Sequence, residues 1–200
     1  LWPLSNESRS KQFLKVLRNS SNIPESMVQR TFRKIKEALP EANLLVATGN
    51  SQVYSIESQI EGDYDLVVEP ERRDTAPAIM LSCAKLAFDL GADPNDSVIV
   101  LPIDTYADDG YYKSLARLAE AVDERPDGLV LLGIEPTYPS EKYGYIVPVD
   151  TVGDIYEVSC FAEKPSEAKA QSLIEKGALW NGGIFGFKLG YGLDILRRYT

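Results

Sequence analysis

Hydrophobic positions along this chain alternate between a helical spacing and short apolar runs. The helical spacing predicts helices over residues 27–39, 51–60, 76–90, 111–123 and 166–176, with a last helix starting near residue 191. The apolar runs predict strands over residues 44–48, 65–69, 97–101, 128–134 and 184–187, and an antiparallel pair over residues 143–149 and 155–161. This alternation predicts an α/β fold with a Rossmann-like mixed, mostly parallel sheet and helices on both faces.

Several residues mark the ends of these helices. Pro24 suits the first turn of the helix over residues 27–39, and Asn50 can cap the following helix. Gly91 is expected to end the helix over residues 76–90. Ser166 and Gly177 are placed to begin and end the helix between them.

Length and end composition predict one domain that continues beyond the sequence. A chain of 200 residues with 44% hydrophobic residues can form one substantial α/β core. No strand precedes residue 1, and a helical pattern runs up to residue 200. We therefore expect a single domain over residues 1–200 that is incomplete at both ends.

Charge and composition exclude several functions. The formal charge of −9 argues against nucleic acid as a partner, and no apolar run is long enough to span a membrane. The chain contains no histidine, which excludes Ser-His-Asp and Cys-His catalysis and histidine-bound zinc within it. Cys83 and Cys160 have no metal-ligand spacing and lie in apolar stretches, so we expect two buried thiols in a cytoplasmic protein.

The apolar run over residues 97–101 is followed by Asp104. Its Val, Ile and Leu residues predict a strand that is buried on both faces. Open α/β sheets bind ligands beyond the carboxyl ends of their strands, where an acid can hold a divalent metal against phosphates. The alternative is that Asp104 caps the next helix or shapes a turn.

Other segments combine charged residues with turn residues. Lys11 is a single basic group that can meet a phosphate or simply be solvated. Asp74 or Thr75 can cap a helix whose free amides could also read the edge of a base. The Glu163-Lys164-Pro165 segment can fix an acid beside a base, or can be a surface turn.

A further segment at residues 180–185 combines an aromatic residue, an amide and two glycines. Its glycines permit close approach of a ligand to the backbone, although a simple turn into a core strand explains them as well. Neither a phosphate-binding Gly-x-x-x-x-Gly-Lys loop nor a dinucleotide Gly-x-Gly-x-x-Gly motif occurs. The missing glycine motif disfavours a Rossmann dehydrogenase.

Taken in order, these segments resemble the sugar-phosphate nucleotidyltransferases, and most closely the mannose-1-phosphate guanylyltransferases (GDP-mannose pyrophosphorylases). The family shows L-W-P-L-S, K-Q-F-L, E-P-x-x-R-N-T-A-P-A, L-P-A-D-H, Y-G-Y-I, F-x-E-K-P and W-N-S-G-M-F. The matching segments here are residues 1–5, 11–14, 69–78, 101–105, 143–146, 161–165 and 180–185. The resemblance therefore extends over nearly the whole chain.

The resemblance implies a Rossmann-like mixed sheet and transfer of a nucleotidyl group from GTP to mannose 1-phosphate, giving GDP-mannose and pyrophosphate with Mg²⁺ as cofactor. It assigns phosphate stabilisation to Lys11 and the metal to Asp104. It assigns the base to Glu69, Pro70, Arg73, Asp74, Thr75 and Ala76. It assigns the sugar phosphate to Gly144, Glu163, Lys164 and Asn181. Such chemistry needs charge neutralisation and alignment, which a chain without histidine can supply.

The chain departs from the family pattern at several points. The family's G-G-S-G-T-R loop and its second metal aspartate are not in this sequence, so we expect these 200 residues alone to lack full activity. Asp74 replaces Asn and Gly182 replaces Ser, which leaves base and sugar preference open. The alternatives are a different nucleotide and hexose 1-phosphate pair, or a catalytically inactive regulatory subunit. A homodimer is also consistent with the sequence.

Overall fold

The computed structural model describes residues 10–71, 73–149 and 155–199. Its longer strands are β3 (Leu45–Gly49), β4 (Asp65–Glu69), β5 (Ser97–Val100), β6 (Val130–Ile134), β7 (Tyr145–Pro148), β8 (Val158–Ala162) and β9 (Leu179–Lys188). Its α-helices are α1 (Met27–Ala38), α2 (Val53–Glu57), α3 (Thr75–Ala84), α4 (Asp109–Glu124), α5 (Glu167–Ile174) and α6 (Leu189–Tyr199). Shorter elements are η1 (Lys11–Phe13), β1 (Leu17–Arg18), β2 (Pro24–Glu25), η2 (Asn50–Gln52) and the π-helical η3 (Lys85–Asp89).

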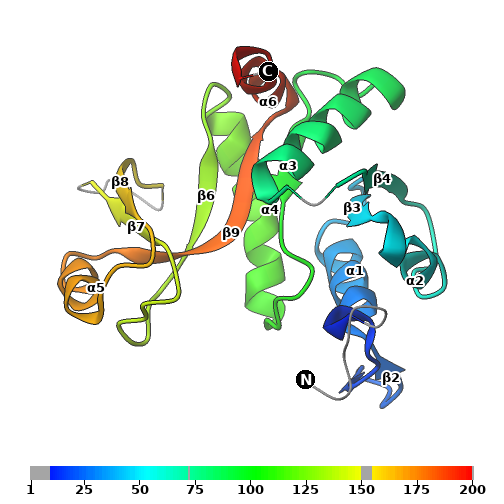
Figure 1. Ribbon diagram of the computed structural model, residues 1–200, viewed down its shortest axis with the longest axis horizontal. Coiled ribbons are helices and arrows are strands. Elements are labelled where there is room, and N and C mark those ends of the chain that lie inside the picture. The colour runs from blue at the N-terminus through cyan, green and yellow to red at the C-terminus, as the bar shows by residue number, and fades with distance from the viewer. Residues whose placement is uncertain (1–9, 72, 150–154, 200) are drawn as a thin grey trace.

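Strand β9 is the centre of a five-stranded sheet. Both β5 and β6 pair with β9 around Phe185 and Gly186, so they lie on its opposite edges. Strand β7 pairs with the start of β9 at Leu179 and Trp180, and β8 extends the sheet from β7. In Figure 1, β9 runs from beside α5 up to α6. Strands β7 and β8 lie with α5 on the left, and α1, α2, β3 and β4 lie on the right, beyond α4.

The expectation of a mostly parallel sheet is wrong, although the mixed α/β architecture is present. Among the described strands only β3 and β4 pair in parallel, and they form a separate two-stranded sheet. All pairings in the five-stranded sheet are antiparallel, and β5 is only partly buried. The alternation of helices and strands in the sequence does not specify strand direction. After the β7–β8 hairpin and α5, the chain returns as β9 in the direction opposite to β5 and β6.

Helices cover both faces of β9, as the sequence predicts. Ile184 packs with Leu115 and Leu118 of α4, and a Cβ on Gly186 would meet the same helix. Phe187, on the opposite face because strand residues alternate, packs with residues of α3 and α6. Helix α1 in turn packs against α4. Ile35 and Ala38 of α1 pack against the same apolar cluster as Ile184 of β9.

Two local predictions are wrong in an informative way. Pro24 is in the short strand β2, and α1 is instead started by Ser26, whose hydroxyl accepts from the Gln29 amide in a capping box. Cys83 is buried as expected, but Cys160 is exposed because β8 is an edge strand of the sheet. The alternating apolar pattern around Cys160 does not reveal that neither face of β8 is covered.

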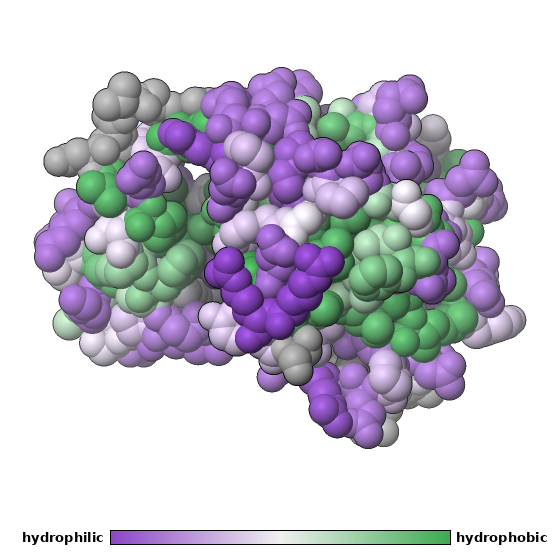
Figure 2. Space-filling view, turned by 90° about the horizontal axis from the view of Figure 1, so that it is seen from above, coloured by the Kyte–Doolittle hydropathy of each residue, from purple (hydrophilic) through white to green (hydrophobic). Residues whose placement is uncertain are grey.

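The face seen from above in Figure 2 carries a central hydrophilic area with hydrophobic residues on either side. No helix among the described ranges is both long enough and apolar enough to cross a membrane.

Candidate active site

Lys11 and Asp104, the two residues proposed to act on phosphates, form an ion pair. The Nζ of Lys11 lies 2.6 Å from Oδ2 of Asp104. Lys11 is the first residue of η1, and Asp104 lies in the loop that follows β5. Residues 93 positions apart in the sequence therefore present opposite charges at one point, as the predicted phosphate and metal site requires.

Asp104 does not cap the helix that follows it. Helix α4 is capped by Asp108, whose side chain accepts a hydrogen bond from the amide of Tyr111. The side chains of Lys11 and Asp104 are 56% and 43% exposed, and ion pairs with that exposure contribute little stability. Helix capping and stabilisation by the ion pair do not account for Asp104, which lies in a turn as the other alternative expects. Its role in ligand binding stays a prediction.

Gln59 links the turn of residues 11–13, which carries Lys11, to the start of α1 by hydrogen bonds. Its Nε2 donates to the carbonyl of Phe13 at 3.0 Å, and its Oε1 accepts from the hydroxyl of Ser26 at 2.6 Å. Phe13 itself packs into the core beside Val28 of α1. The backbone that carries Lys11 is thus held by one buried aromatic side chain and by hydrogen bonds to the start of α1.

The motif that is predicted to bind the base begins at the end of β4. Glu69 is the last residue of that strand, Arg73 forms an ion pair with Glu71 at 2.8 Å, and α3 starts at Thr75. Asp74 stands at the N-cap with φ 64° and ψ −170°, and its side chain makes no capping hydrogen bond. Such a conformation is costly outside glycine and is concentrated at functional sites, which fits a loop shaped to hold a ligand.

A glutamine connects this region with the Lys11 turn. Gln52 donates to the hydroxyl of Ser10 at 3.1 Å and accepts from that of Thr48 at 3.3 Å. Thr48 belongs to β3, whose last residue Gly49 is in register with Glu69. The carboxyl ends of the two parallel strands are therefore connected through Gln52 to the residue before Lys11.

The residues assigned to the sugar phosphate come together at the β7 and β9 junction. The backbone amide of Asn181 donates to the carbonyl of Gly144 at 2.8 Å. A Cβ on Gly144 would lie 2.8 Å from Oε2 of Glu163 and 3.6 Å from Cβ of Asn181. Lys164 follows with a positive φ of 42° and its Nζ lies 3.3 Å from Oε1 of Glu163. All four residues thus form one cluster with a carboxylate, an ammonium and an amide.

Gly182 does not belong to that cluster. A Cβ at this position would lie 2.7 Å from Cδ1 of Ile134, so the residue faces a neighbouring strand. The segment is also not a turn, because β9 begins at Leu179 and includes both glycines. Gly183, with φ 72°, accompanies a register shift in the pairing with β6. The replacement of Ser by Gly here is explained by packing in the sheet.

The structure therefore groups the predicted residues into a phosphate pair, a base loop and a sugar-phosphate cluster. Among the described residues no hydrogen bond or ion pair links the sugar-phosphate cluster with Lys11 or Asp104. The L-W-P-L-S segment lies outside the described residues. Sequence reasoning missed Gln52 and Gln59, because their hydrogen bonds to Ser10, Phe13 and Ser26 join residues more than 30 positions apart and no local pattern signals them.

The predicted metal ligand Asp104 is a single carboxylate beside Lys11. Within the parts of the chain that the structure describes, no three carboxylate, histidine or cysteine side chains converge to form a complete metal site. Mg²⁺ is commonly held by one or two carboxylates together with substrate phosphates and water. An exposed carboxylate such as that of Asp104 fits this mode of binding.

The chain belongs to the nucleotidyl transferase family, whose model matches residues 1–199. A mannose-1-phosphate guanylyltransferase of Sinorhizobium fredii is 35% identical over 196 residues, covering 94% of this chain and 36% of the relative. The alginate biosynthesis protein AlgA of Pseudomonas aeruginosa is 29% identical over 209 residues, covering all of this chain and 41% of the relative. The chain thus spans well under half the length of these relatives.

Solved structures are also similar to this chain. A Thermus thermophilus protein described as a mannose-1-phosphate geranyltransferase superposes with a TM-score of 0.84 at 36% identity, covering 100% of this chain and 56% of that one. A UDP-glucose pyrophosphorylase in complex with UDP-glucose, at 16% identity and a TM-score of 0.58, shares the fold. The resemblance inferred from the sequence motifs is confirmed at the level of the family.

Proposed function

We propose that the protein containing this chain transfers a guanylyl group from GTP to mannose 1-phosphate, yielding GDP-mannose and pyrophosphate. The observation that carries the proposal is the convergence of the motif residues: Lys11 meets Asp104, and Gly144, Glu163, Lys164 and Asn181 form one cluster. Family membership and relatives named as mannose-1-phosphate guanylyltransferases support the same reaction.

In the proposed reaction a phosphate oxygen of mannose 1-phosphate attacks the α-phosphorus of GTP. The bond between the α-phosphorus and the oxygen that bridges to the β-phosphorus breaks, and pyrophosphate leaves with that electron pair. The ammonium of Lys11 stabilises negative charge on the triphosphate. Asp104 would hold Mg²⁺, which when bound supplies further neutralisation of phosphate charge. No proton-transfer residue is required, in keeping with a chain that lacks histidine.

Substrate recognition is divided between the two other groups of residues. The Glu163 carboxylate accepts hydrogen bonds from sugar hydroxyls, and the Asn181 amide and Lys164 bind the sugar phosphate. Gly144 leaves space beside Glu163 that a Cβ would fill. Around Asp74, the loop before α3 accepts the N1 and N2 donors of guanine through carboxylate and carbonyl oxygens, which adenine cannot match.

Two alternatives remain testable. A different nucleotide and hexose 1-phosphate pair is the nearer one, because relatives include proteins of xanthan and alginate biosynthesis. A catalytically inactive regulatory subunit is the other, and the intact Lys11–Asp104 pair and Glu163–Lys164 pair argue against it. We also propose that the protein is cytoplasmic, since the exposed Cys160 thiol suits a reducing compartment. A homodimer is a separate proposal that rests on the family resemblance alone.

Product analysis with the full-length protein tests the proposal. Purified enzyme is supplied with Mg²⁺ and each combination of GTP, ATP, UTP and CTP with mannose, glucose and galactose 1-phosphates. Nucleotide sugars are quantified by chromatography, and pyrophosphate release gives kcat/KM. We expect GTP with mannose 1-phosphate to give the highest kcat/KM. Equal use of ATP and GTP would refute the guanylyl assignment, and no nucleotide sugar from any pair would refute the transferase.

A further inference from the structure

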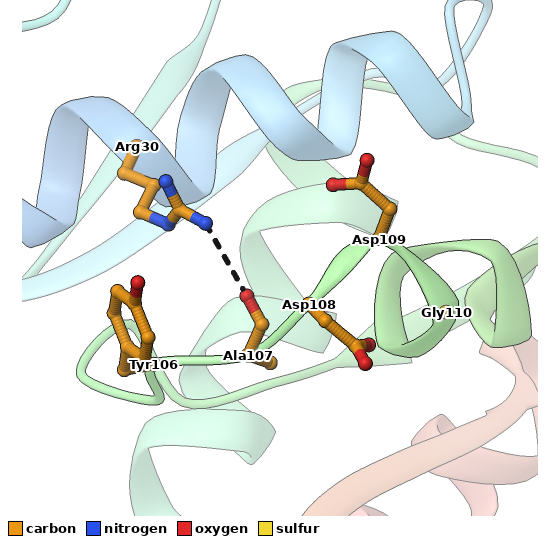
Figure 3. Close-up of a pocket in the computed structure, with 6 residues that line it drawn as sticks. All are labelled: Arg30, Tyr106, Ala107, Asp108, Asp109 and Gly110. Carbon is orange, nitrogen blue, oxygen red and sulfur yellow. Dashed lines mark hydrogen bonds between the residues drawn. The ribbon is translucent and has the colours of Figure 1, made fainter. Parts of the chain in front are cut away.

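The loop that carries Asp104 lies against α1, with a cavity of about 470 Å³ between them. The cavity is lined by Arg30, Tyr106, Ala107, Asp108, Asp109 and Gly110. Figure 3 shows Arg30 extending from α1 toward Tyr106 and the carbonyl of Ala107, with the acidic residues at the start of α4 on the other side. Arg30 is therefore a side chain of α1 that contacts the loop.

Arg30 makes two contacts with this loop. Its Nη2 donates to the carbonyl of Ala107 at 3.4 Å, and its guanidinium carbon lies 5.0 Å above the ring centre of Tyr106. The remaining terminal nitrogen, Nη1, pairs with Glu25 at 3.4 Å. The Arg30 side chain is only 15% exposed.

Arg30 shares the Glu25 carboxylate with a second arginine of α1. Arg33, one turn further along α1, directs both Nε and Nη2 to the Glu25 carboxylate at 3.0–3.3 Å. The Nε of Arg30 is instead buried with no hydrogen-bond partner among the described residues. Arg30 therefore divides its terminal nitrogens between Glu25 and the carbonyl of Ala107, each at 3.4 Å, whereas the hydrogen bonds of Arg33 go to Glu25 and Glu37.

Neighbouring residues of α1 hold the loop on either side. The hydroxyl of Thr31 donates to the carbonyl of Ile103 at 3.3 Å, and Lys34 pairs with Asp109 at 2.8 Å, which lowers the pKa of Asp109. Asp104 thus lies between the contacts at Ile103 and Ala107. Ile103 and Ala107 also pack against apolar clusters, whereas Tyr106 between them is 70% exposed and is contacted by Arg30.

We propose that Arg30 is a positioning residue for Asp104, and that through it α1 sets the geometry of the Mg²⁺ carboxylate opposite Lys11. This inference rests on the proposed function for the role of Asp104. The same helix also holds the Lys11 turn, through the hydrogen bonds of Gln59 to Ser26 and Phe13. Helix α1 is therefore connected both to the turn that carries Lys11 and to the loop that carries Asp104. Arg30 is the residue of α1 that we propose to position the Asp104 loop.

The test compares Arg30→Met with Arg33→Met in the full-length protein. Both changes remove a guanidinium from α1 and a partner from Glu25, but only the first removes contacts with the loop. Hydrogen exchange of residues 104–107 is measured without metal or substrate. The Mg²⁺ concentration for half-maximal activity and the KM for mannose 1-phosphate are measured with saturating GTP. Arg30→Lys, which keeps the charge but loses the planar fork, is the second variant.

We expect Arg30→Met to speed exchange of residues 104–107 and to raise the Mg²⁺ requirement, each about tenfold, with the KM for mannose 1-phosphate unchanged. Arg30→Lys should also speed the exchange of residues 104–107 and raise the Mg²⁺ requirement. Arg33→Met should lower only the melting temperature. Equal effects of Arg30→Met and Arg33→Met on exchange and Mg²⁺ requirement would overturn the proposal. If the wild-type protein forms no nucleotide sugar, the proposed function fails, and the exchange comparison still decides whether Arg30 orders the loop.

Discussion

The ammonium of Lys11 and the carboxylate of Asp104 lie 2.6 Å apart, and each is about half exposed. In the proposed reaction both groups face phosphates, one directly and one through Mg²⁺. Without substrate they neutralise each other. Binding of Mg²⁺ to Asp104 would replace the ammonium as the partner of that carboxylate and leave Lys11 to contact the triphosphate. The pair therefore links the two predicted roles more closely than sequence position indicates.

Replacing Asp104 with Asn keeps the shape of the side chain and removes its charge. We expect kcat of the full-length enzyme to fall by about 100-fold or more, because charge stabilisation in the transition state is lost. Unfolding free energy should change by less than about 1 kcal/mol, since the ion pair is solvent-exposed. Asp123→Asn is the matched control, because Asp123 also pairs with a lysine, Lys188, outside the site. A near-normal rate in Asp104→Asn would contradict the metal assignment.

The two candidate phosphate lysines should have separable kinetic effects. Lys11→Ala should reduce kcat and alter GTP kinetics, because Lys11 lies with Asp104. Lys164→Ala should mainly raise the KM for mannose 1-phosphate, the mark of lost ground-state binding, because Lys164 lies with Glu163. Initial rates with each substrate varied in turn distinguish them. The opposite pattern would mean that the two subsites have been exchanged.

Local patterns are sufficient to predict most elements of this fold. The strand over residues 65–69 has the predicted bounds, and α1 begins at Met27 as its apolar spacing indicates. Strand directions are not predictable in this way, because β9 is antiparallel to β5 only as a result of the intervening hairpin. Strand β9 is also longer than its apolar run predicts, since its two glycines have the composition of a turn but take part in the sheet.

The candidate site shows the same division between local and long-range information. Motif residues such as Asp104 and Glu163 can be named from the sequence because each follows a strand in a recognisable segment. The residues that hold these motif residues in place cannot be named from the sequence. Gln59 and Arg30 act on segments 46 and 77 positions away, and a polar residue on an amphipathic helix ordinarily signals only solvent exposure.

Burial of Cys83 predicts a loss of stability at alkaline pH. Burial raises the pKa of its thiol from 9.0 to about 11, so the unfolded chain loses its proton first as pH rises. Between pH 9 and 11 the folded state binds more protons, and stability should fall by an amount on the order of 2 kcal/mol. Thermal unfolding from pH 8 to 11 measures the effect. Cys83→Ala should flatten this pH dependence, whereas Cys160→Ala should leave it unchanged, because that thiol is exposed.

A methyl group added at Gly144 should be tolerated by the fold but should move the side chain of Glu163, which is 71% exposed. A Cβ there would lie 2.8 Å from Oε2 of Glu163, so Gly144→Ala must displace the carboxylate that we assign to the sugar hydroxyls. We expect the KM for mannose 1-phosphate to rise about tenfold, the effect of one disturbed hydrogen bond to a charged group, with the KM for GTP unchanged. Gly128→Ala is the control, since its Cβ would make only an ordinary contact at 3.7 Å. Unchanged sugar-phosphate kinetics in Gly144→Ala would show that Glu163 does not contact the sugar.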